Sequence, residues 1–367
     1  MIERDLLLIT PDFPPNRGGI ARYLDDLARH FSNRITVLAP LLQKNEINPV
    51  TLYAVVRQSL LFHFVWPHWF KTTWDLIQRR STYRYVITSH VLPFGTAAYI
   101  AQVVTKKPYV VMMHGMDLRL ALTSFRKKRV CEAVLRQAYL VVANSNALAE
   151  ELFLQFGLSN VIVVYPSVDP LKAIITKPES SASSPFRLLT VSRLVDRKGH
   201  DLVLTALAML KLNGTLLAFQ YDIVGSGPTK DALEQLVMEL GLESHVRFLG
   251  DIPDDQLHLY YEEADIFVMP VKDDPVDKEG FGLVFLEAAL FELPSITTNI
   301  RGVNEAVLHE VTGLLIQDND LDMLAQSITL LSHDVVYRRA LGVSAKERAV
   351  QEFCAEKQYG KLNPYLV

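Results

Sequence analysis

The stretch Ile266-Phe-Val-Met-Pro270, followed by Lys278-Glu-Gly-Phe-Gly-Leu-Val-Phe-Leu-Glu287, decides the fold. Its first part is a short apolar run typical of a buried strand. If Glu279 and Glu287 shared one helix, their side chains would point about 80° apart, so we do not expect a single carboxylate face. We instead predict a strand, then a loop that carries Glu279, then a helix that carries Glu287.

The glycines of this stretch support a ligand site. Gly280 and Gly282 let the backbone approach a bound group closely, because they lack a Cβ atom. Residues 283–291 have helical composition, and the first-turn amides of such a helix can receive hydroxyls or phosphates.

Composition and length limit the class of protein. The 367 residues, 49% of them hydrophobic, are enough for two domain cores. Cys131 and Cys354 provide neither a disulfide framework nor metal-ligand spacing, which favours a reducing cytoplasm. The N-terminus runs directly into a strand-like Leu6-Leu-Leu-Ile9 and does not have the pattern of a signal peptide.

The net charge of −4 is divided unevenly along the chain. Residues 1–170 hold 19 Lys and Arg against 12 Asp and Glu, and the remainder holds 18 against 29. This asymmetry suggests that one half of the chain meets an anionic surface or substrate, and a membrane surface fits better than nucleic acid. Nucleic acid is not expected, because no arginine-rich arm, zinc-finger spacing or aromatic RNA-binding signature accompanies the charge.

Short apolar runs alternate with longer amphipathic stretches throughout the chain, which predicts parallel sheets wrapped by helices. The predicted strands are residues 6–10, 35–38, 85–88, 109–113 and 140–143, then 187–191, 220–224, 246–249, 266–269 and 294–297. A Pro- and Ser-rich linker at 177–185 separates them. We predict two Rossmann-like domains, residues 1–176 and 186–346, facing a central cleft into which the strand ends open, and a C-terminal segment, 347–367.

Two motifs follow predicted strands in the first half. Gly18-Gly19 begins a helical pattern and would let the backbone approach a bound group, although a simple strand-to-helix turn explains it equally well. His114-Gly-Met-Asp117 places an imidazole at a strand end, with Asp117 as an orienting carboxylate. A lone histidine is more often structural; His90 is a similar but weaker candidate.

The second half places cations and glycines at strand ends. Arg193 and Lys198 lie on a short loop that enters a helix, where they suit a diphosphate; a solvated basic turn is the alternative. Gly225 follows another predicted strand, but a lone Gly-x-Gly is a weak signal. The backbone near Ile252, after the next strand, could contact a nucleobase edge, but this run alone does not establish that contact. Asp273, Asp274 and Asp277 indicate a solvated turn more than a metal site.

Together these motifs resemble the family-four retaining glycosyltransferases of the two-Rossmann, GT-B type. The resemblance spans nearly the whole chain, because the motifs occur in the family's order and approximate spacing. It implies that the first half binds an acceptor and the second a nucleotide-diphosphate sugar, without metal or cofactor. It also implies that a C-terminal helix returns to the first half.

The resemblance also implies residue roles. Arg193 and Lys198 would hold the donor diphosphate, and Glu287 the ribose. Glu279 and the backbone of Phe281, Gly282 and Leu283 would hold the sugar, the Ile252 backbone would meet the base, and Gly225 would lie among the substrate-binding residues. His114 would face the reacting sugar, with Asp117 nearby, and Gly18 and Gly19 would pass close to the diphosphate or acceptor.

All three tryptophans, Trp66, Trp69 and Trp74, fall within nine residues. They follow Leu52, Val55, Val56, Leu60 and His63 at helical spacing, among basic residues, and Arg126-Lys-Lys-Arg129 adds charge. This pattern suits amphipathic helices on an anionic membrane surface through residues 50–84. An acceptor pocket or core helices are equally weighted alternatives, and a membrane-spanning helix is not expected.

We therefore expect a cytoplasmic, membrane-peripheral retaining hexosyltransferase that extends a glycan or lipid-linked acceptor. GDP-mannose is the first guess for the donor, since the Asp12-Phe-Pro-Pro and Glu279–Glu287 runs resemble envelope mannosyltransferases. A UDP-sugar-dependent enzyme and a sugar-phosphate synthase remain alternatives. So does a non-catalytic sugar-nucleotide-binding or scaffold protein, which the cost of unused buried charges disfavours.

Overall fold

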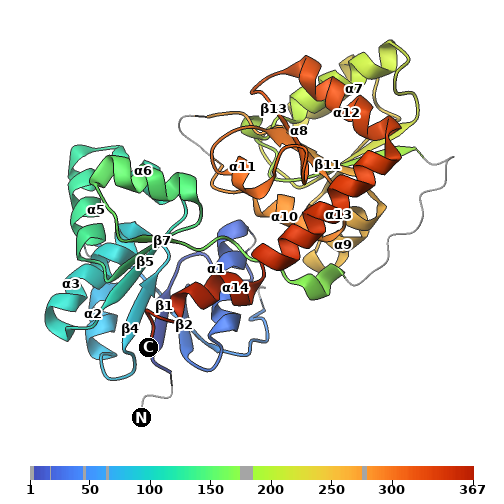
Figure 1. Cartoon of the computed structure of the whole chain (residues 1–367). Helices are drawn as coiled ribbons and strands as arrows, with labels where there is room; N and C mark the ends of the chain where they lie inside the picture. Colours follow the sequence, from blue (N-terminus) through green and yellow to red (C-terminus); the bar gives the residue numbers. More distant parts are fainter. Residues whose placement is uncertain (1–3, 17, 44–46, 63–65, 174–184, 275–278) are drawn as a thin grey trace. The chain divides into compact units, whose positions relative to one another are not determined.

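The computed structural model describes the chain except for residues 1–3, 17, 44–46, 63–65, 174–184 and 275–278. It divides into two compact units, and each is an α/β unit built on one parallel sheet (Figure 1). The first unit comprises Met1–Ser167 and Ala355–Val367, and the second comprises Val168–Cys354. The predicted linker, 177–185, lies almost wholly outside the described residues.

The first unit holds a seven-stranded parallel sheet in the order β3-β2-β1-β4-β5-β6-β7. Its elements are β1 (Leu6–Ile9), α1 (Gly19–His30), β2 (Ile35–Ala39), β3 (Ala54–Arg57), α2 (Phe70–Gln78), β4 (Tyr85–Thr88), η1 (Val91–Gly95), α3 (Thr96–Thr105), β5 (Tyr109–Met113), α4 (Met116–Leu122), α5 (Phe125–Gln137), β6 (Leu140–Ala143), α6 (Asn146–Phe156), β7 (Val161–Val163), α14 (Ala355–Tyr359) and η4 (Gly360–Leu362).

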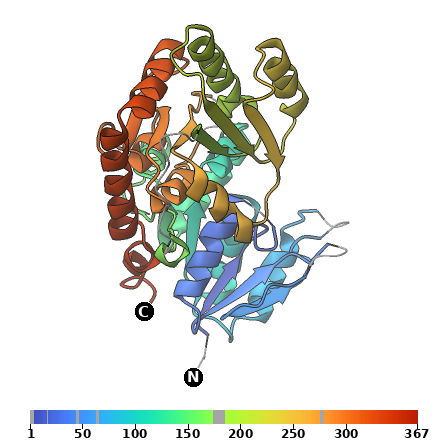
Figure 2. The same ribbon diagram turned by 90° about the vertical axis from the view of Figure 1, so that its right-hand side faces the viewer.

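Helices cover both faces of this sheet. Leu7 and Ile9 of β1 point into a core that includes side chains of α2, α3, α5 and α6. Leu6 and Leu8 point to the opposite core, which α1 and α14 complete. Because both faces are buried, the central strands are continuous apolar runs. Figure 2 shows α1 lying across the strands of this sheet.

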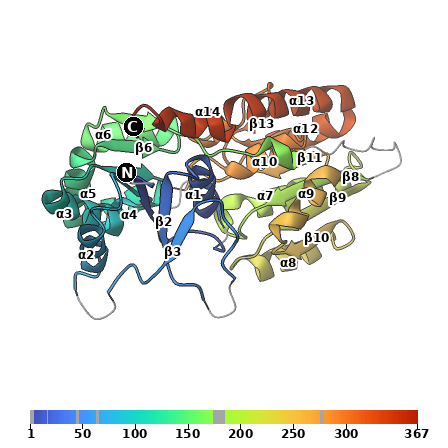
Figure 3. The same ribbon diagram turned by 90° about the horizontal axis from the view of Figure 1, so that it is seen from below.

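The second unit holds a six-stranded parallel sheet in the order β10-β9-β8-β11-β12-β13. Its elements are η2 (Pro170–Ala173), β8 (Phe186–Val191), η3 (Asp196–Lys198), α7 (His200–Leu212), β9 (Phe219–Val224), α8 (Lys230–Glu239), β10 (Val246–Gly250), α9 (Asp254–Glu263), β11 (Ile266–Met269), α10 (Leu283–Leu290), β12 (Ser295–Thr298), α11 (Val303–Ala306), β13 (Gly313–Ile316), α12 (Leu321–His333) and α13 (Val335–Glu352). In Figure 3, β10 and α8 lie at one edge of this unit.

The end of the chain returns to the first unit, but later than predicted. Helix α13 continues to Glu352 and packs against α10, so the crossing comes after Cys354 and not at residue 347. The Tyr359 hydroxyl then donates to the backbone carbonyl of Tyr23, 2.9 Å away, and Arg34 donates to the carbonyl of Leu366. These contacts join the C-terminal segment to α1 and to the residue just before β2.

Three strands were missed by the sequence patterns, namely β3, β7 and β13. The spacing of Val55 and Val56 predicted a helix there, and that prediction was wrong, because both residues lie in β3. All four residues of this edge strand are only partly buried. An edge strand has a neighbour on one side only, so its sequence lacks the strongly apolar run of a central strand.

Candidate active site

A tight turn after β8 places two cations inside the second unit. The 3₁₀ turn η3 contains Arg197 and Lys198, and both residues are buried. It ends at Gly199, which has a φ of 70°. A Cβ atom at Gly199 would collide with the carbonyl oxygen of Pro270. The glycine therefore allows the turn to pass directly against the end of β11, from which the chain continues toward Glu279.

Glu279 binds both cations of the turn. Its Oε2 atom accepts a hydrogen bond from Lys198 Nζ at 2.6 Å and another from Arg197 Nη1. The Glu279 side chain is only 14% exposed. Burial by itself would raise the pKa of Glu279, but the charges of Lys198 and Arg197 outweigh it and lower this pKa to about 2. The carboxylate is thus held in its ionised form.

Lys198 experiences opposing effects. Burial lowers its pKa most, the carboxylate of Glu279 raises it, and the nearby positive charges of Arg197 and Arg193 lower it again. Arg193 itself is exposed on the same loop. The prediction paired Arg193 with Lys198 and missed Arg197. A charged residue in a three-residue turn usually points to solvent, so the sequence contains no signal that this arginine is buried.

Glu287 lies apart from this ion-pair cluster, as the predicted loop and helix require. Helix α10 begins after Gly282, which has a φ of 85°, so Glu279 precedes the helix and Glu287 lies within it. The Tyr261 hydroxyl donates to Glu287 Oε2 at 3.1 Å. Sequence analysis did not single out Tyr261. Its hydroxyl fixes the carboxylate, while its ring stacks on Phe291.

The predicted glycine and base-contacting residues lie at the ends of β9 and β10. A Cβ atom on Gly225, whose φ is 126°, would overlap the carbonyl oxygen of Ser192. Gly225 therefore has a packing role that the sequence did not reveal, since it holds the Arg193 loop in place. Ile252 is half-buried just after β10. Leu283 opens α10, whereas the Phe281 ring packs on Phe353.

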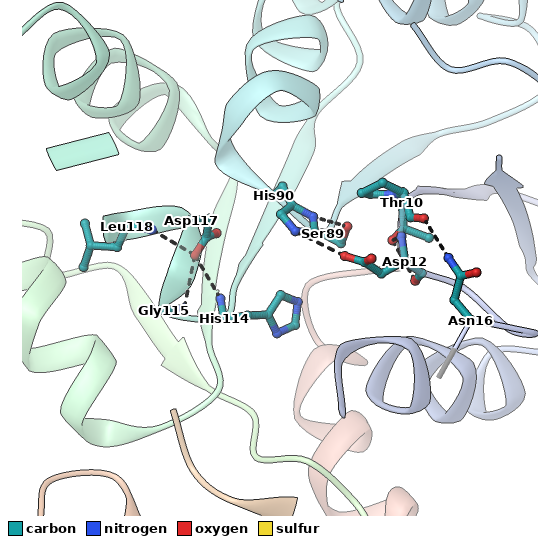
Figure 4. A network of polar contacts seen from close by, with 10 residues as sticks. Thr10, Asp12, Asn16, Ser89, His90, His114, Gly115, Asp117 and Leu118 are labelled. Carbon is teal, nitrogen blue, oxygen red and sulfur yellow. Dashed lines mark hydrogen bonds and ion pairs between the residues drawn. The ribbon is translucent and has the colours of Figure 1, made fainter. Parts of the chain in front are cut away.

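The first unit carries a different polar site, where three neighbouring strands end. Asp12 follows β1, His90 follows β4 and His114 follows β5 (Figure 4). Gly18 and Gly19 lie at the start of α1 on exposed backbone, and nothing lies within 4 Å of where their Cβ atoms would be. That open space is compatible with the predicted close approach of a ligand.

His114 is buried and its environment keeps it neutral. Burial, with a smaller contribution from His90, lowers the pKa of His114 to about 3. Its Nε2 atom has no hydrogen-bond partner within the described part of the chain. The Tyr23 ring meets the imidazole edge to face, with centroids 5.3 Å apart. An uncharged imidazole with an open nitrogen can exchange a hydrogen bond with a ligand hydroxyl.

Asp117 does not orient the His114 ring, contrary to the prediction. Its Oδ1 atom accepts hydrogen bonds from the backbone amides of His114, Gly115 and Leu118, at 3.3, 3.1 and 3.0 Å. Figure 4 shows the imidazole pointing away from this carboxylate. Asp117 therefore stabilises the strand-to-helix turn, including Gly115 with its φ of 97°. Burial raises the pKa of Asp117 despite these amides.

The described residues contain no group of three or more His, Cys, Asp or Glu side chains placed to hold a metal ion. Of the acidic residues considered in the sequence, Asp273 is exposed and Asp274 half-buried. Asp277 lies outside the described residues.

The tryptophan segment is largely on the surface. Trp66 is 84% exposed and Trp74 is 51% exposed, so these two tryptophans do not lie in the core, although α2 buries Leu76 there. Trp69 immediately precedes α2, and Trp74 lies within it. Across the described ranges, no helix combines the length and apolarity that crossing a bilayer requires.

Comparisons with known proteins agree with this architecture. A model named "Glycosyltransferase Family 4" matches residues 17–171, and one named "Glycosyl transferases group 1" matches residues 172–348. The chain is 28% identical to a GDP-mannose-dependent alpha-(1-6)-phosphatidylinositol monomannoside mannosyltransferase from Mycobacterium tuberculosis. That match covers 98% of this chain and 97% of the mycobacterial protein. A putative colanic acid biosynthesis glycosyltransferase, WcaL, from Escherichia coli is 27% identical over 67% of this chain and 61% of its own.

A similar solved structure is that of Anabaena Alr3699/HepE in complex with UDP and glucose. It has a TM-score of 0.79 and 22% identity, and the match covers 99% of each chain. This likeness shows the GT-B fold. With the two family models together spanning residues 17–348, the chain belongs to the family-four glycosyltransferases, which are retaining, metal-independent hexosyltransferases that use a nucleotide-sugar donor.

Proposed function

We propose that this enzyme transfers mannose from GDP-mannose to a hydroxyl group of a glycan or lipid-linked acceptor of the cell envelope. The observation that carries a diphosphate donor is the buried cluster of Arg197, Lys198 and Glu279. Two buried cations at a turn after a parallel strand are suited to a diphosphate. The choice of mannose is supported by the name of the mycobacterial relative.

The residues of the second unit would divide the donor among them. Arg193 and Lys198, joined by Arg197, would neutralise the diphosphate. Glu279 and the backbone of residues 281–283 would bind the sugar hydroxyls, and Glu287 the ribose. The backbone at Ile252 would meet the base.

Bond formation at the anomeric carbon needs stabilisation of the leaving group more than a protein nucleophile. The acceptor oxygen bonds to the anomeric carbon as the carbon–oxygen bond to the diphosphate breaks, and the electron pair leaves with the diphosphate. The acceptor's proton passes to the departing phosphate oxygen on the same face of the sugar, so the anomeric configuration is retained. The cations would stabilise the developing charge, and His114 and the Gly18-Gly19 backbone would face the reacting groups.

The test is a thermal-shift screen of the purified protein with GDP, UDP, ADP and their sugar conjugates. We expect GDP and GDP-mannose to raise Tm most, because a ligand that binds only the folded state stabilises it. A larger shift with UDP-glucose would identify a UDP-sugar-dependent enzyme instead, and transfer to a sugar phosphate would identify a synthase. Absence of any shift, together with no donor turnover, would favour a non-catalytic protein.

The identity of the site is tested by substitution. Glu279→Ala and His114→Ala should each lower turnover strongly while the protein stays folded by circular dichroism. The control is Asp318→Ala, which removes an exposed carboxylate from the second unit. Unchanged turnover in both site variants would refute these assignments.

We further propose that an anionic membrane surface binds the first unit. Trp66, Phe70 and Trp74 recur every four residues, and all three are exposed. Helix α3, which packs on α2, adds exposed Val103 and Val104. Exposed aromatic side chains beside basic ones are typical of interfacial contacts, and Arg126, Lys127 and Arg129 are also exposed.

Vesicle flotation tests this contact. Wild-type protein should float with phosphatidylglycerol-containing vesicles and less with phosphatidylcholine vesicles. The Trp66→Ser/Trp74→Ser double variant should float less, whereas Leu212→Ser, which removes a 92% exposed side chain of the second unit, should behave as wild type. Absence of wild-type flotation would rule out the contact.

A further inference from the structure

The carboxylate of Asp12 and the imidazole of His90 lie next to each other, beside His114. They follow β1 and β4, which are adjacent parallel strands. His90 Nε2 lies 3.4 Å from Asp12 Oδ2. The rings of His90 and His114 are 6.3 Å apart between centroids. The polar side chains of Asp12, His90 and His114 therefore lie together at the carboxyl ends of neighbouring strands (Figure 4).

The surrounding backbone holds this pair in place. The Ser89 hydroxyl lies 2.8 Å from His90 Nδ1, and Ser89 is fully buried, with its amide bound to the carbonyl of Ile9. On the other side, the Thr10 hydroxyl donates to the carbonyl of Asp12 and accepts from its amide, both at 3.0 Å. Ile9, Thr10, Ser89 and His90 thus position Asp12, whose side chain remains 43% exposed.

The neighbouring His114 nitrogen indicates that a ligand completes the site. Its Nε2 atom is buried and lacks a partner among the described residues. A buried polar atom without a hydrogen bond costs free energy, and such atoms are uncommon unless a ligand or water serves them. The exposed carboxylate of Asp12 lies on the same side of the imidazole as His90, away from Asp117.

We propose that Asp12 binds hydroxyl groups of the acceptor, and that His90 is the residue that positions it. This inference rests on the proposed transfer to a glycan or lipid-linked acceptor. A carboxylate accepts hydrogen bonds at two oxygens, so one oxygen can face His90 while the other receives a hydroxyl of the acceptor. Vicinal hydroxyls of a sugar or cyclitol fit this chemistry.

The same chemistry excludes a phosphate from this subsite. A phosphate group has no proton to offer a carboxylate once it is ionised, and the two negative charges would repel each other. If the acceptor is a phospholipid glycan, its phosphate therefore lies away from Asp12, and the sugar or cyclitol ring lies against it. Asp12 is thus a specificity-determining residue for a polyol ring.

The experiment uses two defined acceptors, octyl α-D-mannopyranoside and octyl β-D-glucopyranoside, with the donor identified by thermal shift. Asp12→Ala should raise the KM of the better glycoside about tenfold or more, which is the usual effect of losing a hydrogen bond to a charged group. The dissociation constant of the donor nucleotide, measured by calorimetry, should change by less than about twofold. Asp12→Asn should show the same pattern more weakly, and it keeps the test valid if the alanine variant does not fold.

His90 is tested by rescue. His90→Ala should raise the acceptor KM less than Asp12→Ala does. His90→Gln should restore much of the loss, because the glutamine amide can donate a hydrogen bond to the Asp12 carboxylate. If His90 had a purely structural role, His90→Ala and His90→Gln would both lower Tm, and His90→Gln would not restore the acceptor KM. The charge-matched control is Asp318→Ala.

Each outcome decides between the inference and the proposed function. If wild type glycosylates a glycoside and Asp12→Ala leaves its KM within about twofold, the inference is wrong and the proposed function stands. If Asp12→Ala weakens the nucleotide as much as the glycoside, Asp12 belongs to the donor site and the inference is again wrong. Donor hydrolysis without transfer to either glycoside would refute a polyol subsite. Failure of wild type to turn over any donor would refute the proposed function itself.

Discussion

The polar site of the second unit pairs its two buried cations with one internal carboxylate, whereas that of the first unit leaves a buried nitrogen open. Glu279 binds both Arg197 and Lys198, but His114 Nε2 has no partner in the described structure. A diphosphate that binds the cations must therefore compete with an internal carboxylate, and a ligand at His114 gains a hydrogen bond without breaking one. The comparison teaches that the proposed donor site is preassembled around an internal carboxylate, while the proposed acceptor site of the first unit would be completed by its ligand.

The largest effect should come from removing a cation from the ion-pair cluster. Lys198→Met keeps the length of the side chain and removes its charge. We expect the rate of nucleoside diphosphate release to fall about 10²–10³-fold, the usual cost of losing one group that stabilises developing charge. Lys230→Met, on the exposed start of α8, is the control. A fall of less than about tenfold would show that Lys198 is not needed for the leaving group.

The internal balance of the cluster predicts a second effect, on stability at acid pH. The pKa of Glu279 is lowered to about 2 in the folded protein, below its ordinary value in the unfolded chain. Its stabilising contribution is therefore complete above about pH 4.5 and is lost as the pH falls toward 2. The contribution is on the order of 3 kcal/mol.

The measurement is urea unfolding of wild type and Glu279→Gln between pH 2.5 and 7. The variant should be less stable at neutral pH, and the difference should narrow below pH 4.5. Glu234→Gln, which removes a surface i,i+4 pair with Lys230, should follow wild type. A difference that does not change with pH would mean that the ion pairs do not determine the titration of Glu279.

The open site of the first unit predicts a weaker acid effect over a different pH range. Since the folded pKa of His114 is lowered to about 3, the unfolded chain takes up a proton first as the pH falls below about 6.5. The folded state then loses about 2 kcal/mol of stability between pH 6.5 and 5. His114→Asn, which cannot titrate, should lose less over this interval in urea unfolding. Equal losses in both proteins would show that His114 ionises normally.

The smallest effect separates a packing glycine from a ligand-facing one. Gly225→Ala should destabilise the protein by about 1–2 kcal/mol, because its Cβ would meet Ser192 and its φ is positive. Gly19→Ala enters open space at a helical residue, so Tm should stay near the wild-type value while turnover falls. A lower Tm for Gly19→Ala, or an unchanged one for Gly225→Ala, would reverse the two roles.

The sequence predicted most central strands, because a strand buried on both faces must be apolar along its whole length. The runs that became β1, β4, β5, β8 and β11 were found in this way. The edge strand β3 was mistaken for helix, because its residues are half-buried and short runs lack a clear period. The loop at Glu279 and the helix at Glu287 were correct, since glycines break a helix and the following residues favour one.

The site was predicted less completely than the fold. Lys198 and Glu279 were both predicted as site residues, and their roles stay predictions. Their direct contact, and the contact of Arg197 with Glu279, depend on a turn that brings together residues separated by 81 and 82 positions in the sequence. Asp117 illustrates the opposite limit. Its position beside His114 suggested a side-chain pair, and the structure instead binds its carboxylate to backbone amides. A residue's neighbours along the chain do not determine which way its side chain points.

By itself, the sequence determined two parallel α/β units, the strand ends that carry polar residues, and the family to which the ordered motifs belong. These follow from local patterns: apolar runs, glycines and charges at fixed places along the chain. Only the tertiary structure decided that Glu279 pairs with both Arg197 and Lys198, that Gly225 is a packing residue, and that Asp12 lies next to His90. Those outcomes depend on contacts between distant segments and on burial, which sets the charge state of each group, and neither is encoded in spacing.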